Sequence, residues 1–470
     1  GGWAWVIPKG AKHPKEAWEL IRRLSSVETA MKLADVQERT ESSQGRPFIP
    51  GLNANRHITE ALFKKYLKEN PKADKKFVEA MQVFIDLLPQ SKYRPVTPVG
   101  QLLWNQHREA TENAIFGKLP PQAALDQGTA IVQRELDRII VPEDGAVIRW
   151  ELMAQVYMAL IALAVLAICV WFVKRFRGGE QSRKEAIAGY MFASPWLFGF
   201  IVFTGGPIIC SLIMSVCSYD AMSPSRFVGI RNYEEMLYEE PYFWKSLWNT
   251  VFMVLGVPLG MAFGLGVALM LNAKVKGMAI YRTLFYLPAI VPGVAAALLW
   301  ILIFNPNHGM LNWALAHIGI AGPKWLNDEN WAKTSLILQG LWGAGAGMIV
   351  WLAGLKAIPD DLYEAAAIDG ANVLQRFRHI TLPMLTPYIF FNLVMGLIGT
   401  FQIFTPAYLM TQGGPVNSTL FYAYNLFNQA FRYMHMGYAS ALAWVLFGIV
   451  FLVTMYQTRT AKRWVHYQGE

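Results

Sequence analysis

Seven long apolar stretches constrain this chain more than any other feature of its sequence. The first, residues 152–173, holds 22 residues without a charge. As a helix rising about 1.5 Å per residue it would be about 33 Å long, enough to cross a hydrocarbon core of about 30 Å. With a hydrophobic content of 54%, the chain is typical of a mainly α, polytopic α-helical membrane protein. The six later stretches lie at 187–217, 246–271, 281–304, 334–355, 386–410 and 437–457.

Basic residues are distributed unevenly over the segments between these stretches. Four segments, on one side of the membrane, carry 14 Lys and Arg, whereas three on the other side carry 6. Because Lys and Arg are retained in the cytoplasm, we expect the C-terminus to be cytoplasmic and residues 1–150 to be extracytoplasmic. The net charge of +9 therefore indicates membrane topology and contact with lipids, and it does not indicate nucleic-acid binding. The basic segments are 174–184, 274–282, 356–378 and 459–463, and the others are 218–245, 305–333 and 411–436.

The segment at 356–385, on the cytoplasmic side by this topology, has the clearest signs of function. Asp360 or Asp361 can cap a helix, and Gly370 can supply a left-handed exit from it. Pro383 can stop a second helix. The pattern predicts a compact helix–turn–helix that projects from the membrane.

A row of small alanines at 365–367, beside the acidic Glu364, favours a docking element, because small side chains let another surface approach closely. This segment, with Asp-Gly-Ala at 369–371 and Leu-Pro at 382–383, resembles the EAA motif of bacterial ABC importer permeases. The resemblance implies that the loop fits a groove of a separate ATP-hydrolysing subunit. It assigns coupling to Glu364, Ala365, Ala366, Asp369, Gly370, Leu382 and Pro383.

The resemblance covers about residues 185–465 and is to the carbohydrate-uptake branch, of the maltose and glycerol-phosphate type. It implies an ABC importer permease fold with six core spans, here behind one N-terminal anchor span, in a bacterial cytoplasmic membrane. The implied partners are ATP-binding cassette subunits, a second permease subunit that forms a heterodimer with this one, and a sugar-type solute. The motifs include Arg-Thr-Leu-Phe-Tyr-Leu-Pro at 282–288, Thr-Gln-Gly-Gly-Pro at 411–415 and Met-Gly-Tyr-Ala-Ser-Ala at 436–441.

The front of the chain resembles the C-terminal part of extracytoplasmic solute-binding proteins of family 1. Gly-Gly-Trp at 1–3, Ile-Pro-Lys at 7–9 and Phe-Gly-Lys at 116–118 carry this resemblance. It implies a partial α/β lobe without the rest of a two-lobed fold. Residues 3–8 alternate like a strand that has no partner, and Trp3 either stacks on a sugar or packs in a core.

Three parts of the chain are expected from these resemblances. Residues 1–145 are a C-terminal fragment of a solute-binding domain. Residues 146–184 are a transmembrane anchor with a basic cytoplasmic linker. Residues 185–470 are the permease domain, with its coupling loop at 356–385.

Signs of catalysis and of bound cofactors are missing from the sequence. The Gly-Lys pair at 117–118 lacks the glycine pattern of a phosphate-binding loop, so ATP and magnesium are expected on the partner ATPase and no cofactor on this chain. Neither the histidines nor the cysteines have the spacing of a metal site. We therefore expect no catalytic residue, no metal ligand and no enzyme activity.

Polar residues in the stretch 386–410 are candidates for the solute path. Asn392, Thr400 and Gln402, together with Gly396 and Gly399, fall within about half of a helix circumference at 100° per residue. They can bind sugar hydroxyls or, equally, make contacts between helices.

Two other classes of function compete with transport. A membrane-anchored solute receptor would have no use for the loop from Glu364 to Pro383. A membrane-embedded enzyme would need clustered His, Asp or Glu at one depth, which the sequence does not show. The favoured function is import of a carbohydrate or related polar solute, whose identity the sequence leaves open.

Overall fold

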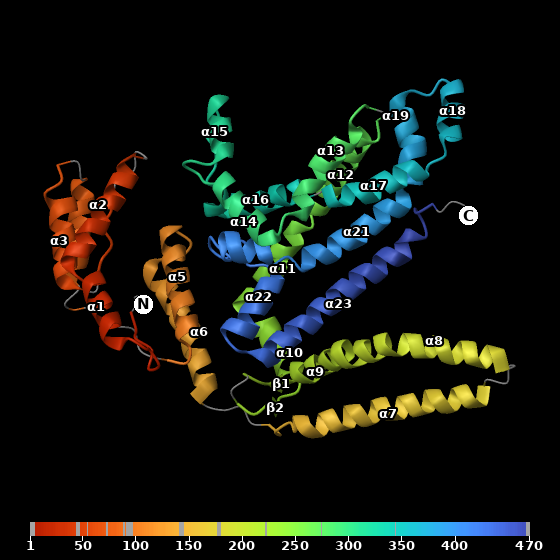
Figure 1. Cartoon of the computed structure of the whole chain (residues 1–470), viewed down its shortest axis with the longest axis horizontal. Coiled ribbons are helices and arrows are strands. Elements are labelled where there is room, and N and C mark those ends of the chain that lie inside the picture. Colours follow the sequence, from red (N-terminus) through yellow and green to blue (C-terminus); the bar gives the residue numbers. More distant parts are fainter. Residues whose placement is uncertain are drawn as a thin grey trace. The chain divides into compact units, whose positions relative to one another are not determined.

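The computed structural model describes most of the chain, apart from short stretches. The described residues are 5–43, 48–53, 55–71, 74–87, 90, 97–140, 145–175, 180–220, 223–273, 275–343 and 345–466. They form two compact units, Gly1–Thr97 and Pro98–Glu470, and each is considered by itself. Figure 1 shows helices as the dominant element in both.

The first unit is a small cluster of helices. Its core packs Ala34 against Ile58, Leu62 and Tyr66, and the Asp35 carboxylate accepts hydrogen bonds from Lys65 Nζ and Tyr66 OH at 2.6 and 2.5 Å. The helices are α1 (Pro14–Leu24), α2 (Val27–Ser43), α3 (Arg56–Phe63), the π-helical turn η1 (Lys64–Lys68) and α4 (Lys75–Leu87).

The strand expected at residues 3–8 has no counterpart in the described part of that segment. Residues 5–8 are irregular, and Trp3 lies outside the described residues. In the described part of residues 5–140 every regular element is a helix. The β part of the expected α/β lobe is therefore not seen there.

The second unit begins with a helical hairpin, α5 (Gly100–Ile115) and α6 (Pro121–Ile140). Packing thus groups residues 98–140 with the membrane part, although the sequence places them in a domain that ends at 145. Their origin in a solute-binding domain stays a prediction.

The anchor and the first core span follow this hairpin. They comprise α7 (Trp150–Arg175), α8 (Glu180–Gly199), η3 (Phe200–Gly205) and α9 (Gly206–Ser215). A short antiparallel ladder then pairs β1 (Cys217–Ser218) with β2 (Arg226–Phe227), with Cys217 opposite Phe227.

The rest of the second unit is a bundle of apolar helices with short connecting elements. Its long helices are α11 (Pro241–Met253), α12 (Gly256–Leu271), α13 (Met278–Ile290), α14 (Gly293–Ile303), α16 (Glu329–Trp342), α17 (Gly345–Ala357), α21 (Thr386–Phe401) and α23 (Met436–Ala461). Between them lie α10 (Arg231–Glu234), η4 (Glu235–Glu239), α15 (Met310–His317), η5 (Trp325–Asn327), η7 (Ala407–Thr411), α22 (Tyr422–Phe427) and η8 (Asn428–Arg432).

In the described residues, four helices are long and apolar enough to cross a membrane, and three bent pairs raise the possible spans to seven. The stretch expected as one span at 281–304 is sharply broken, because α13 and α14 meet at 97°. Val291 precedes Pro292 and has an extended backbone, with φ −64° and ψ 126°, which proline imposes on the residue before it. The stretch expected at 386–410 ends as a helix at Phe401 and resumes in η7.

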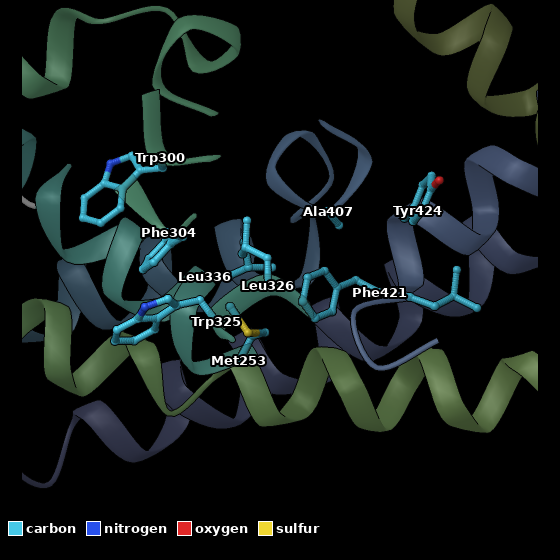
Figure 2. Packing of buried hydrophobic residues seen from close by; sticks show 10 residues of the cluster. Met253, Trp300, Phe304, Trp325, Leu326, Leu336, Ala407, Phe421 and Tyr424 are labelled. Atoms are coloured by element: carbon cyan, nitrogen blue, oxygen red, sulfur yellow. The ribbon is translucent and has the colours of Figure 1, made fainter. Parts of the chain in front are cut away.

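Three buried clusters hold the described part of the bundle together, and one of them joins α11, α22 and α23 through Phe243, Tyr422 and Tyr438. The other two bear on the candidate site. The first contains Trp300, Phe304 and Trp325 with Phe421 and Tyr424, and Figure 2 shows these side chains coming from separate segments of the chain. Because aromatic rings bury large areas, they bring the loops at 305–333 and 402–436 onto the helices. The second cluster lies among α12, α17 and the start of α21 and contains Met348, Trp351, Leu355, Ile358 and Leu385.

Candidate coupling loop and solute path

The loop at 356–385 is firmly attached to the helical bundle. Ile358 is buried in the second cluster together with Leu385. Tyr363 OH and Thr381 Oγ1 are 2.9 Å apart and share a hydrogen bond, which joins the first helix of the loop to the second. Apolar burial at both ends of the loop and this hydrogen bond fix its base against α17 and α21.

The first helix of the loop is α18 (Asp360–Ile368), and Pro359 is its N-cap. The prediction that Asp360 or Asp361 caps the helix is wrong, since both lie in its first turn and no side chain caps it. Pro359 already turns the backbone into the helix, which leaves the aspartates too late in sequence to cap. Their charges still stabilise the helix through its dipole.

The exit from α18 is the predicted left-handed glycine. Gly370 has φ +77°; its N–H donates to Ala367 O at 3.1 Å, and Ala371 N–H donates to Ala366 O at 2.9 Å. This pair of bonds is a Schellman motif, which glycine stabilises because it has no Cβ. The turn therefore depends on Gly370.

The second helix of the loop starts at Asn372. The Asn372 side chain accepts from Gln375 N–H at 2.9 Å, and the Gln375 side chain accepts from Asn372 N–H at 2.8 Å, which is a capping box. The helical path runs through α19 (Val373–Arg376), η6 (Phe377–Thr381) and α20 (Leu382–Met384). It ends one residue after Pro383 and meets α21 at 64°.

The predicted coupling residues divide into an exposed and a partly buried group. Glu364, Ala365, Asp369 and Gly370 are exposed and Ala366 is partly exposed, whereas Leu382 and Pro383 are half-buried at the base. The exposed group surrounds the tip of α18. The half-buried pair can position the loop but offers less surface to a partner.

Three large apolar side chains at the tip of the loop were missed by the sequence analysis. Ile368, Val373 and Leu374 are 87%, 76% and 74% exposed. Exposed apolar side chains gathered in one place mark an interaction surface. The sequence did carry a signal for this surface, because these three large apolar residues lie in a loop that is otherwise predicted to face water.

A groove of about 400 Å³ lies between α12, α16, α17 and α21. Asn392, Gly396 and Thr400 line it, whereas Gly399 and Gln402 are exposed and lie outside its lining. The Asn392 amide donates to Tyr388 O, and the Thr400 hydroxyl donates to Gly396 O, both at 2.8 Å. Both donors thus bond to their own helix, while the lone pairs of the two side-chain oxygens remain available as acceptors.

The fold is a multi-pass helical bundle that carries a helix–turn–helix loop on a buried base. This arrangement is typical of the membrane-spanning subunits of transporters. The family model described as "Binding-protein-dependent transport system inner membrane component" matches residues 256–466. Together with the curated relatives, it shows that the chain belongs to this family of ABC importer permeases, which are transport subunits without an ATPase site of their own.

Curated relatives align with about three fifths of the chain. The probable ABC transporter permease protein YesP of Bacillus subtilis is 47% identical over 293 residues, which are 61% of this chain and 94% of YesP. The lactose transport permease LacF of Rhizobium radiobacter is 36% identical, over 59% of this chain and 94% of LacF. The trehalose/maltose transport permease MalF of Thermococcus litoralis is 32% identical, over 59% and 95%.

A solved structure supports the fold. A chain of a bacterial ABC transporter that imports the acidic polysaccharide alginate aligns with a TM-score of 0.54 and 22% identity, over 60% of this chain and 98% of that chain. The polytopic permease fold expected from the sequence is thereby confirmed.

Proposed function

We propose that the chain imports a carbohydrate or related polar solute and is driven through the α18 loop by a separate ATPase subunit. The observation that carries the coupling role is the exposed apolar tip at Ile368, Val373 and Leu374 on a firmly attached loop. Water-exposed side chains of this size favour a partner that covers them. The names of the lactose and trehalose/maltose permeases support a sugar as solute.

The structure supports a direct route from the loop to the solute. Ile358 and Leu385 join the base of the loop to α17 and α21 in one buried cluster. The same two helices contribute Gly347 and Asn392 to the groove of about 400 Å³. Because packed interiors transmit displacement, movement of α18 by the ATPase would shift two walls of that groove.

Several further features belong to this proposal. A second, different permease subunit closes the open side of the groove, and ATP with magnesium is held by the ATPase. The coupling loop and C-terminus are cytoplasmic, and residues 1–145 are an extracytoplasmic solute-binding fragment, with Trp3 as a candidate sugar contact. The unequal distribution of Lys and Arg supports this orientation.

A pair of variants tests the docking surface. Ile368→Asp places a charge at the 87% exposed tip of α18, whereas Ile320→Asp places one at a 52% exposed site, in the loop at 305–333 on the other side of the predicted topology. We expect Ile368→Asp to lose the ATPase on purification and Ile320→Asp to retain it. Equal retention of the ATPase by both variants would show that α18 is not the docking element.

A further inference from the structure

The α5–α6 hairpin is bonded to the rest of the second unit along α5, at its turn and near the end of α6. At the turn, Lys118 Nζ lies 2.7 Å from Glu329 Oε2 at the start of α16. Along α5, Gln106 Nε2 donates to Tyr242 OH at 2.7 Å, at the start of α11. Such contacts join segments far apart in the chain, and each helix of the hairpin makes its own.

Two carboxylates of α5 hold the loop that follows η7. Glu112 Oε2 accepts from Val416 N–H at 2.9 Å. Glu109 Oε1 accepts from Asn417 Nδ2 at 2.7 Å, and Glu109 Oε2 accepts from Tyr242 OH at 2.6 Å. Hydrogen bonds to charged acceptors are the stronger kind, so the hairpin ties this loop to α11.

The loop that α5 holds has a strained backbone. Val416 and Asn417 have φ of 50° and 53°. This region is unfavourable for a β-branched residue such as Val416, and such a conformation persists only where the surroundings hold it. The carboxylate of Glu112 on Val416 N–H is one of the contacts that do so.

The end of α6 is bonded to the segments around α23. Glu135 Oε1 lies 2.6 Å from His435 Nε2, and Arg138 lies 2.9 Å from Glu235 Oε1. The side chains of both pairs are about four-fifths buried or more. Separating such a pair leaves a buried polar group without its hydrogen bond, which is unfavourable. These two pairs therefore oppose separation of the hairpin from the segments around α23.

We propose that the α5–α6 hairpin is a splint that holds the extracytoplasmic ends of α11, α16 and α23 together throughout the transport cycle. This proposal rests on the proposed function. If the splint holds, the solute entrance opens between this subunit and the second permease subunit, and the helices within this subunit do not separate. The hairpin lies outside the residues that the family model matches, 256–466.

Cross-linking the hairpin turn to α16 tests whether these parts separate. Lys118 and Glu329 are both partly exposed, at 47% and 34%, so cysteines there can be reached by a short bis-maleimide. The variant carries Lys118→Cys and Glu329→Cys in a chain whose native cysteines are replaced, and it is assembled with its partner subunits in membranes. N-ethylmaleimide on the same variant is the matched control, because it modifies both cysteines without joining them.

The splint predicts that the cross-link forms at the same rate with and without ATP and magnesium, and that cross-linked and N-ethylmaleimide-treated transporters turn over alike. A cross-linking rate that falls when ATP is present would overturn the proposal, and so would arrest by the bis-maleimide alone. The rate comparison needs no knowledge of the solute. If the double-cysteine variant takes up no sugar even before reagent is added, while ATP leaves the cross-linking rate unchanged, the result counts against the proposed solute and not against the splint.

Discussion

Replacement of Gly370 by valine is the sharpest test of the coupling loop. The residue has φ +77°, and a Cβ added there would meet no atom within 4 Å. The free-energy cost of the substitution therefore comes from the backbone conformation alone. It is about 1–2 kcal/mol for a residue with a Cβ in the left-handed region. That energy shifts the balance between the native turn and its alternatives by a factor of about 5–30.

The consequence is confined to the tip of the loop, because the base at Ile358 and Leu385 is buried independently of Gly370. We expect Gly370→Val to reach the membrane and fold, but to displace Glu364 and Ile368 relative to the second loop helix. Solute-stimulated ATP hydrolysis and uptake should fall by about tenfold if the displacement costs about 1.4 kcal/mol of the coupled state. Both are measured on the purified complex with its partner subunits.

A matched control lies elsewhere in the chain. Gly277 has φ +79° and likewise no atom within 4 Å of an added Cβ, so Gly277→Val has the same backbone cost outside the loop. Gly370→Asn should recover part of the activity, since asparagine tolerates the left-handed region. If the two valine variants lose activity equally, or if Gly370→Val transports at the unmodified rate, the coupling role of the turn is refuted.

Three further predictions have independent outcomes. Glu364→Lys should weaken binding of the ATPase by reversing an exposed charge, whereas Asp361→Lys, in the first turn of the same helix, should weaken it less; co-purification measures both. Burial, followed by the charge of Glu235, raises the pKa of Glu240 to about 8, so ionising this group costs folded-state stability as pH rises from about 4.5 to 8. Glu240→Gln should therefore raise the melting temperature at pH 8 and leave it nearly unchanged at pH 5; an equal effect at both values would contradict this. Asn392→Leu removes a polar group from the groove and should reduce uptake without loss of the ATPase, while Gln402→Leu, outside the groove lining, should have little effect on transport.

The sequence predicted those parts of the structure that depend on local pattern. Apolar length fixes where a helix can cross a membrane, and Gly370 was recognisable because a left-handed turn needs a residue without a Cβ. The cap was predicted at Asp360 or Asp361 because aspartate is a common cap. Pro359, one residue earlier, took that position.

Other features had a partial signal or none. Pro292 marks the place of the bend between α13 and α14, but its angle of 97° depends on how the two halves pack. The bonds of Glu109 and Glu112 to Asn417 and Val416 join residues 308 and 304 apart in the chain. Contacts of that range depend on the folded arrangement and leave no periodicity in the sequence.

The two proposals together locate the movement that transport requires. If the hairpin holds the outer ends of α11 and α16 fixed, displacement that enters through α18 cannot be relieved by separating those ends. It must be absorbed nearer the loop, where α20 and α21 meet at 64° on the buried Leu385 and where the groove wall carries Gly340, Gly343 and Gly347. Glycines without side chains let helices slide closely past one another. We therefore infer that α17 and α21 move mainly at their loop-side ends, which changes the width of the groove on the side of the loop.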